Sequence, residues 1–167
     1  MTTLSFKNIK RIAFDALLGN PELREWCLSR YGKPPAVVND LDPMEPPSED
    51  DCPVVGLTTI GGSTGQDESE YIRAFTVRVA IHDEAVIEER TPDGRLLKRD
   101  YAGSDAVTEL LEDLIYPILC DAFNARNFPL SATEESVESM NMNIFQAKAE
   151  LTVQMDKAIG ERVPLLG

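Results

Sequence analysis

The sequence predicts an α+β fold, with a mainly antiparallel sheet, helices packed on one face and a protruding β-hairpin. Three observations lead to this prediction. Apolar and polar residues alternate over 145–155, as on a strand with one buried and one exposed face. Apolar residues recur at helical spacing over 107–123, which is typical of an amphipathic helix. An Asp-Gly turn signal separates two charged segments within 86–101.

The length and composition are those of one globular domain, 1–167. A domain usually has about 100 to 200 residues, and 43% hydrophobic with 27% charged residues is typical of a globular chain. Uninterrupted apolar runs stay well below the roughly 18 residues of a membrane-spanning helix. The charged N-terminal residues do not fit a signal peptide. We therefore expect a soluble protein, made in the cytoplasm, without membrane contact.

The net charge is strongly negative. The chain has 16 Lys and Arg against 29 Asp and Glu, which gives −13. Such a surface repels phosphate, so conventional nucleic-acid binding, which depends on Lys and Arg, is not expected. Two interpretations of the charge stay open. It is either a solvated surface that keeps the protein soluble, or an acidic lining or partner-docking face.

Two short helices are expected at the N-terminal end. Ser5 can cap the first, which Gly19 ends. Asn20 followed by Pro21 begins the second, because the N–H that proline lacks has no partner at the first helical position. Gly32 ends this second helix.

A long acidic, proline-rich surface loop is expected over 33–53. Asp40 and Asp42 match the start of a calcium loop, but the later Gly and Glu of that motif are missing, so we expect no calcium site. A short strand over 54–60 follows. The glycine-rich residues 61–65 should end it as a turn, because they lack the lysine of a phosphate-binding loop and acidic residues follow them.

The predicted hairpin, 86–101, follows a second long strand over 71–82. Its arms carry charges of both signs, which favours pairing across the turn. It has few large apolar residues to bury in its own subunit, so it either extends into solvent or lies on a neighbouring subunit. The candidate interface residues of the hairpin are Glu88, Arg90, Asp93, Gly94, Arg95, Lys98 and Arg99.

The C-terminal third should supply the longest helix and the last two strands. Ser104 is expected to cap the helix, whose apolar stripe would cover the dry face of the last strand. Pro117 lies opposite that stripe and should kink the helix rather than end it. A polar strand is expected over 133–140, and 160–167 should be a loose tail or a docking segment.

Catalytic and metal-binding patterns are weak. His82, the only histidine, precedes two acidic residues and could act as a general base, but such residues are common where a strand ends. Cys27, Cys52 and Cys120 form no CxxC pair, so neither a disulfide framework nor a zinc site is expected. Cys27 and Cys120 should be buried thiols and Cys52 exposed. We expect a protein that is not an enzyme and has no cofactor.

The order of the predicted elements resembles that of the tail terminator proteins of long-tailed bacteriophages, also called tail completion or minor tail proteins. The likeness spans 5–155: an N-terminal helix, a pair of strands ending in the residues 75–81, a hairpin, a long helix and the closing strand 145–155. It implies an α+β subunit in a homo-hexameric ring of the virion. The ring would cap the tail tube, halt its polymerisation and face the head-tail connector protein.

Two features agree with such a ring. A hairpin that does not fold back on its own core could reach the next subunit, and repeated head-to-tail contacts can close into a ring. An acidic interior would let DNA pass without specific binding. Arg78, Lys148 and Glu150, on the wet faces of the two long strands, would then line the lumen or a subunit contact. Ordinary solvent exposure is the simpler alternative.

The acidic loop and the second N-terminal helix depart from the family pattern, so another neck or head-tail joining component also fits the resemblance. A rival from a different class is a soluble acidic inhibitor or DNA mimic that occupies a basic cleft on a host enzyme. It predicts a monomer or dimer whose binding weakens steeply with salt. An enzyme acting through His82 ranks third.

Overall fold

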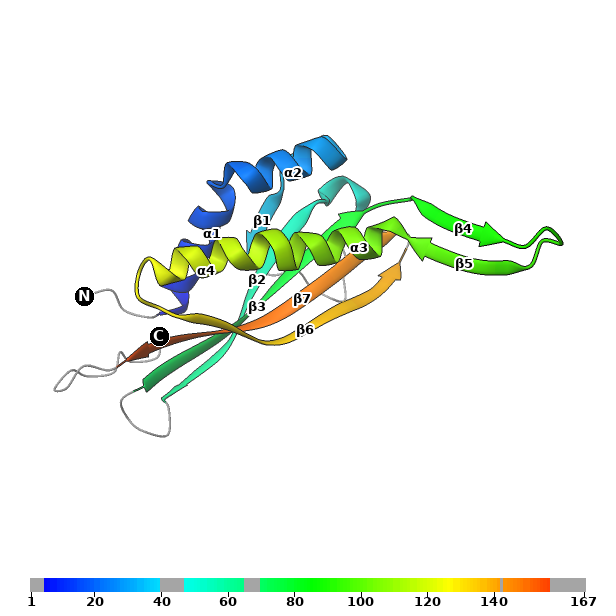
Figure 1. Ribbon diagram of the computed structural model, residues 1–167. Coiled ribbons are helices and arrows are strands. Elements are labelled where there is room, and N and C mark those ends of the chain that lie inside the picture. Colours follow the sequence, from blue (N-terminus) through cyan, green and yellow to red (C-terminus); the bar gives the residue numbers. More distant parts are fainter. Residues whose placement is uncertain (1–4, 40–46, 65–69, 142, 157–167) are drawn as a thin grey trace.

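A five-stranded sheet with helices on one face forms the body of the molecule, and a two-stranded hairpin projects beyond it (Figure 1). The computed structural model describes residues 5–39, 47–64, 70–141 and 143–156. The strand order in the main sheet is β1-β2-β3-β7-β6, and only β1 and β2 run parallel. The predicted α+β class, mainly antiparallel sheet and protruding hairpin are therefore confirmed.

The strands include the two long ones that the alternation predicted. β3 and β7 pair antiparallel along their whole length, and β7 lies between β3 and the edge strand β6. The strands are β1 (Ala36–Asn39), β2 (Val54–Thr64), β3 (Glu70–His82), β4 (Val86–Arg90), β5 (Leu96–Tyr101), β6 (Leu130–Asn141) and β7 (Ile144–Asp156).

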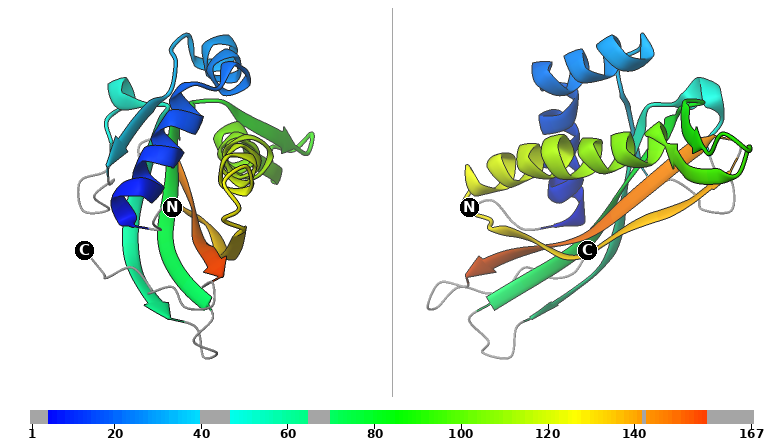
Figure 2. Two further views of the ribbon diagram at one scale, coloured as in Figure 1. Left: turned by 90° about the vertical axis from the view of Figure 1, so that its left-hand side faces the viewer. Right: turned by 45° about the vertical axis from the view of Figure 1, so that its right-hand side comes forward.

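The helices all lie on the same side of the sheet (Figure 2). They are α1 (Phe6–Leu18), α2 (Pro21–Tyr31), α3 (Ala102–Glu109), a π-helical turn η2 (Leu110–Ile115) and α4 (Tyr116–Asn124), with a 3₁₀ turn η1 (Glu49–Asp51). The predicted N-terminal caps are confirmed. The Ser5 hydroxyl accepts from the Asn8 N–H at 3.2 Å, and the Asn20 side chain accepts from the Leu23 N–H at 2.9 Å. None of the helices in the described part of the chain combines the length and the apolar character that a membrane-spanning segment requires.

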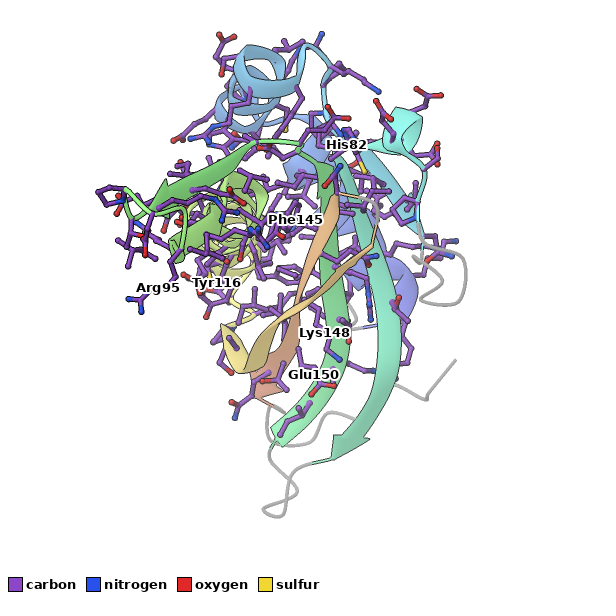
Figure 3. The ribbon with its side chains drawn as sticks, turned by 90° about the vertical axis from the view of Figure 1, so that its right-hand side faces the viewer. His82, Arg95, Tyr116, Phe145, Lys148 and Glu150 are labelled. Carbon is purple, nitrogen blue, oxygen red and sulfur yellow. The ribbon has the colours of Figure 1, made fainter. Side chains whose placement is uncertain are left out.

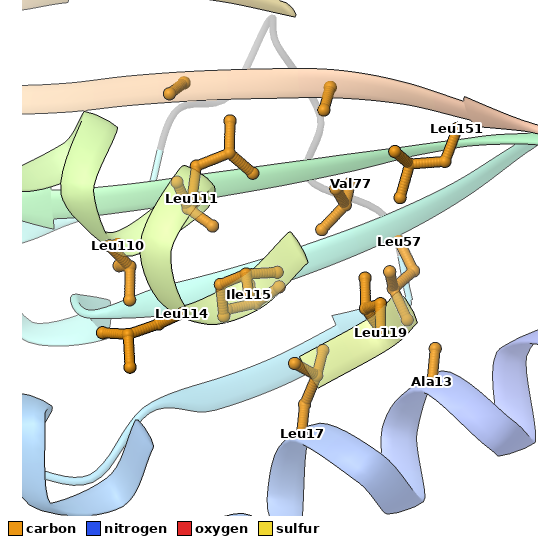
Figure 4. Close-up of a cluster of buried hydrophobic side chains, with 14 of the residues drawn as sticks. Ala13, Leu17, Leu57, Val77, Leu110, Leu111, Leu114, Ile115, Leu119 and Leu151 are labelled. Carbon is orange, nitrogen blue, oxygen red and sulfur yellow. The ribbon is translucent and has the colours of Figure 1, made fainter. Parts of the chain in front are cut away.

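The core lies between the helices and the alternate residues of β3 and β7 (Figure 4). On the helix-facing side of β7 the buried residues are Phe145, Ala147, Ala149, Leu151 and Val153, and Ile144 at the start of the strand is buried in a second, smaller cluster. The helix stripe of α3, η2 and α4 covers them, as the sequence predicts. At the start of α3, the backbone of Gly103 lies so close to the Phe145 ring that a Cβ would overlap it. The apolar face of β3 also holds one charge, because Arg73 is fully buried with its guanidinium 4.4 Å from the centre of the Phe6 ring.

The predicted surface loop 33–53 is partly wrong. Residues 36–39 form the edge strand β1 beside β2, and Val37 and Val38 pack against buried residues. Cys52, expected to be exposed, is buried, because the chain turns inward through η1 before β2 begins. The calcium candidates Asp40 and Asp42 lie outside the described residues.

The predicted glycine turn at 61–65 is also wrong. β2 continues through these glycines to Thr64, with an irregular register between Thr59 and Gly61. Glycine is tolerated at such a bulge, since it has no side chain to place there. The connection to β3 falls at 65–69, outside the described residues.

The long helix differs from prediction at its start and continues past its proline. It begins at Ala102, not after a Ser104 cap, because the Ala102 N–H donates to the Ala85 carbonyl at the base of the hairpin, at 3.1 Å. The helix widens at η2, where the Tyr116 N–H bonds back to the Leu111 carbonyl, and then continues past Pro117. A widened turn accommodates the missing N–H and the ring of a proline. The predicted tail, 160–167, lies outside the described residues.

Candidate functional site

The hairpin of β4 and β5 forms its own two-stranded sheet apart from the core (Figure 1). Its tip is a defined turn. The Thr91 N–H donates to the Arg95 carbonyl and the Arg95 N–H donates to the Thr91 hydroxyl, both at 2.9 Å. Gly94 has φ of +89°, a conformation that side chains disfavour. The Thr91 hydroxyl also donates to Asp93, which lowers the pKa of that carboxyl. The predicted Asp-Gly turn is therefore confirmed.

Three of the predicted interface residues hold one another within the hairpin. Glu88 accepts from Arg99 Nε at 2.7 Å and lies 3.4 Å from Arg90 Nη2. The hydrogen bond from Arg99 lowers the pKa of Glu88. In the described part of the chain, the side chains of Arg95 and Lys98 have no such partner. These two cations are therefore the ones that the hairpin presents outward.

The hairpin also exposes more apolar surface than the sequence predicts. Val86, Ile87, Leu96 and Leu97 are 43%, 54%, 40% and 58% exposed. Among the described residues, Leu18 at 58% is the only other exposed large hydrophobic side chain. Clustered exposed apolar surface on a soluble protein typically marks a contact with another molecule. The hairpin is therefore the strongest candidate for an interface.

The polar sheet face is the second candidate. Arg78 on β3 pairs opposite Lys148 on β7, and Thr76 pairs opposite Glu150, so these residues share the face that points away from the helices. All four are half-buried. Figure 3 shows Lys148 and Glu150 on the open side of the sheet. The structure thus brings Arg78, Lys148 and Glu150 together, as predicted, and places them away from the hairpin.

A polar cleft of about 300 Å³ lies where β3 ends. Its lining comes from three parts of the chain: the end of α2 with the residues just after it, η1 with the residue that follows it, and the end of β3. The lining residues are Tyr31, Lys33, Glu49, Asp50, Cys52 and His82. No motif or spacing in the sequence links these residues, and only His82 and Cys52 stand out from the sequence alone.

Polar contacts between α2 and α3 hold one wall of the cleft. Arg30 donates to both carboxylate oxygens of Glu109 at 3.0 Å, and Trp26 Nε1 donates to Glu109 at 3.2 Å. The Arg30 guanidinium also lies 4.4 Å from the centre of the Trp26 ring. These contacts fix the last turn of α2, which carries Tyr31.

The charges in the cleft surround His82. Its Nε2 lies 3.7 Å from a Glu49 oxygen and 3.8 Å from a Glu84 oxygen. Lys33 donates to the backbone carbonyl of Asp50 at 2.9 Å.

Tyr31 and Cys52, which also line the cleft, are held in their protonated forms. Burial raises the pKa of Tyr31 to about 12, with Asp83 adding to the effect, and burial raises the pKa of Cys52 to about 11. At neutral pH Cys52 is therefore a thiol, which is a poor nucleophile and a poor metal ligand. In the described ranges, no group of three or more His, Cys, Asp or Glu side chains is placed to hold a metal ion.

No protein-family model matches the chain, and neither does any curated protein sequence. Function therefore has to be inferred from the hairpin, the polar sheet face and the cleft.

Proposed function

We propose that this protein is a structural component of a bacteriophage tail, similar to tail terminators, that assembles into a closed ring. The ring, with six subunits in the related family, caps the tail tube, stops its polymerisation and joins the tail to the head connector. It acts in the virion after assembly in the host cytoplasm, without a cofactor or catalysis. The main support for this proposal is the hairpin, which forms a separate sheet and leaves its apolar side chains exposed within its own subunit.

The position of the hairpin supports a head-to-tail contact. It projects from one end of the molecule, so it can reach a different surface on a neighbouring copy (Figure 1). Contacts between two different surfaces close into a ring when the rotation between copies allows it. A second copy is the occupant that the apolar hairpin and the family resemblance both favour.

Charge supports a second copy as well. Segment 86–101 has four basic and four acidic residues, so it is neutral within a chain of net charge −13. The long helix offers the complementary surface, because 102–125 contains no Lys or Arg and exposes four acidic residues. These are Asp105, Glu112, Asp113 and Asp121. Contact between this helix and the outward cations Arg95 and Lys98 would pair opposite charges and guide the register of assembly.

The polar sheet face then faces the lumen or a neighbouring subunit. Arg78 and Lys148 bring positive charge to a chain that is otherwise strongly acidic, and Glu150 lies beside them. DNA would pass such a lumen without specific binding, since Arg78 and Lys148, partly offset by Glu150, leave little positive charge on each subunit to attract phosphate. The partners proposed for the two ends of the ring are the tail tube protein and the head-tail connector protein.

Light scattering coupled to size-exclusion chromatography, followed by negative-stain microscopy, tests the proposal. A hexamer of 18.5 kDa subunits has six times that mass, about 111 kDa, and should show a central hole. Monomer alone at high concentration, with tail tube protein also present, would overturn the ring.

The acidic helix face favours a second candidate, a soluble inhibitor or DNA mimic that occupies a basic cleft on a host enzyme. Such a protein is a monomer or dimer, and its affinity for a basic partner falls steeply as salt rises. Small featureless particles, together with salt-sensitive capture of a basic enzyme, would favour it over the ring.

A further inference from the structure

We propose that the cleft beside His82 is a receptor for the guanidinium group of an arginine on a partner protein. This site is separate from the hairpin and the polar sheet face, and the inference does not depend on the ring. Its volume of about 300 Å³ is at the small end of ligand cavities, which suits a single side chain.

The charge of the cleft favours a cation. Glu49 and Asp50 line it, and Glu84 reaches His82 from the loop after β3. The only cation counted with these three carboxylates is the Lys33 ammonium. The formal charge of these four side chains is therefore −2, with His82 taken as neutral. Lys33 lines the cleft too, and its ammonium donates to the Asp50 carbonyl of η1. A phosphate or carboxylate ligand would be repelled, whereas a cation would be attracted.

The carboxylates of Glu49 and Glu84 do not form hydrogen bonds with the His82 imidazole. Both oxygens lie 3.7–3.8 Å from His82 Nε2, which is too long for a hydrogen bond. The Glu49 and Glu84 side chains are also 69% and 74% exposed, so they can turn toward an incoming donor.

Tyr31 supplies an independent observation. Its hydroxyl is buried and, within the described part of the chain, has no hydrogen-bond partner. A buried polar group without a partner is costly, so a ligand that donates to this oxygen is favoured. The hydroxyl is neutral over the physiological range because burial raises the Tyr31 pKa to about 12.

The spread of the acceptors favours arginine over lysine. Carboxylates come from η1 and from the β3–β4 loop, while the Tyr31 hydroxyl comes from α2. A guanidinium presents five N–H donors in a planar fork that can reach several acceptors at once. A lysine ammonium is a compact point charge and would satisfy fewer of them.

His82 is the only histidine of the chain and therefore a unique reporter. The test follows its imidazole NMR signal while a capped Gly-Arg-Gly peptide is titrated into the full chain carrying Ile87→Ser and Leu97→Ser. These two substitutions lie on the hairpin and keep a neighbouring copy away from the cleft, so the result is independent of the ring. Matched peptides carry lysine or the uncharged isostere citrulline.

We expect a saturable shift of the His82 signal with the arginine peptide, a several-fold weaker response with lysine and none with citrulline. Glu49→Gln and Tyr31→Phe should each weaken arginine binding at least several-fold, while Glu22→Gln on the far end of α2 should not. An equal response to citrulline, no saturable shift, or loss of binding in Glu22→Gln alone would overturn the proposal. Thermal unfolding of each variant separates loss of the site from loss of the fold.

The source of the arginine is resolved in the assembled wild-type protein. If Arg95→Ala moves the His82 signal there, the guanidinium comes from the hairpin of a second copy. If only added tail or connector protein moves it, the guanidinium comes from that partner.

Discussion

Removing apolar surface from the hairpin should separate the copies without unfolding the subunit. The change is Ile87→Ser together with Leu97→Ser. Both side chains are exposed in the isolated subunit, at 54% and 58%. Because neither contributes much to the core, we expect the free energy of unfolding to change by no more than about 0.5 kcal/mol.

The effect on assembly follows from the area that remains to be buried. Full burial of an Ile or Leu side chain stabilises by about 1.5–3 kcal/mol. Slightly more than half of each side chain is exposed, so the pair should contribute about 2–3 kcal/mol to one hairpin contact. At about 1.4 kcal/mol for each factor of ten, the dissociation constant of that contact should rise about 30- to 150-fold.

A dilution series followed by light scattering and sedimentation velocity measures this change. Leu18→Ser is the matched control, because Leu18 is also 58% exposed but lies at the end of α1, away from the hairpin. The control should assemble like wild type. The reasoning fails if the double variant keeps the wild-type mass at every dilution, or if Leu18→Ser dissociates just as readily.

Three further predictions concern the subunit itself. Gly103→Ala should lower the free energy of unfolding by about 1–3 kcal/mol in urea titrations, because the new Cβ would overlap the Phe145 ring. Phe123→Ala, which empties a fully buried position in the core, should lower it by about 3–5 kcal/mol, and an unchanged urea midpoint would contradict the close packing of Phe123. The hydrogen bond from Arg99 lowers the pKa of Glu88, so its contribution to the hairpin is complete above the ordinary carboxyl pKa and is lost as the pH falls through the lowered value. The protection of the hairpin amides against hydrogen exchange, corrected for the intrinsic pH dependence of the exchange reaction, should therefore fall on acidification, and Glu88→Gln should remove that fall.

The elements that were predicted correctly carry strong local signals. Strand β7 alternates apolar and polar residues over 145–155, and the helix stripe repeats without interruption, so each pattern favours one buried face. The caps at Ser5 and Asn20 could also be predicted from local sequence, because each capping side chain accepts from an N–H only three residues further along the chain.

The elements that were missed depend on contacts distant in the sequence. β1 lies within a proline-rich acidic segment and becomes a strand only by pairing with β2, as Ala36 pairs opposite Val54. The start of the long helix is set by a bond to Ala85, 17 residues before Ala102, which outweighs the local capping signal of Ser104. The residues that line the cleft are spread over 31–82, so no local sequence pattern predicts that they lie together.

The apolar residues of the hairpin can be read from the sequence, but their exposure on both faces of the ribbon cannot. Val86 and Ile87 are adjacent, and successive side chains of a strand point to opposite faces. Each face of the ribbon therefore exposes an apolar residue, and an isolated two-stranded ribbon has no third layer to cover either. A flat neighbouring surface could cover only one face and would leave Val86 or Ile87 in water. The surface that receives this hairpin should accordingly be a groove, or a gap between two neighbouring copies, that encloses the ribbon from both sides.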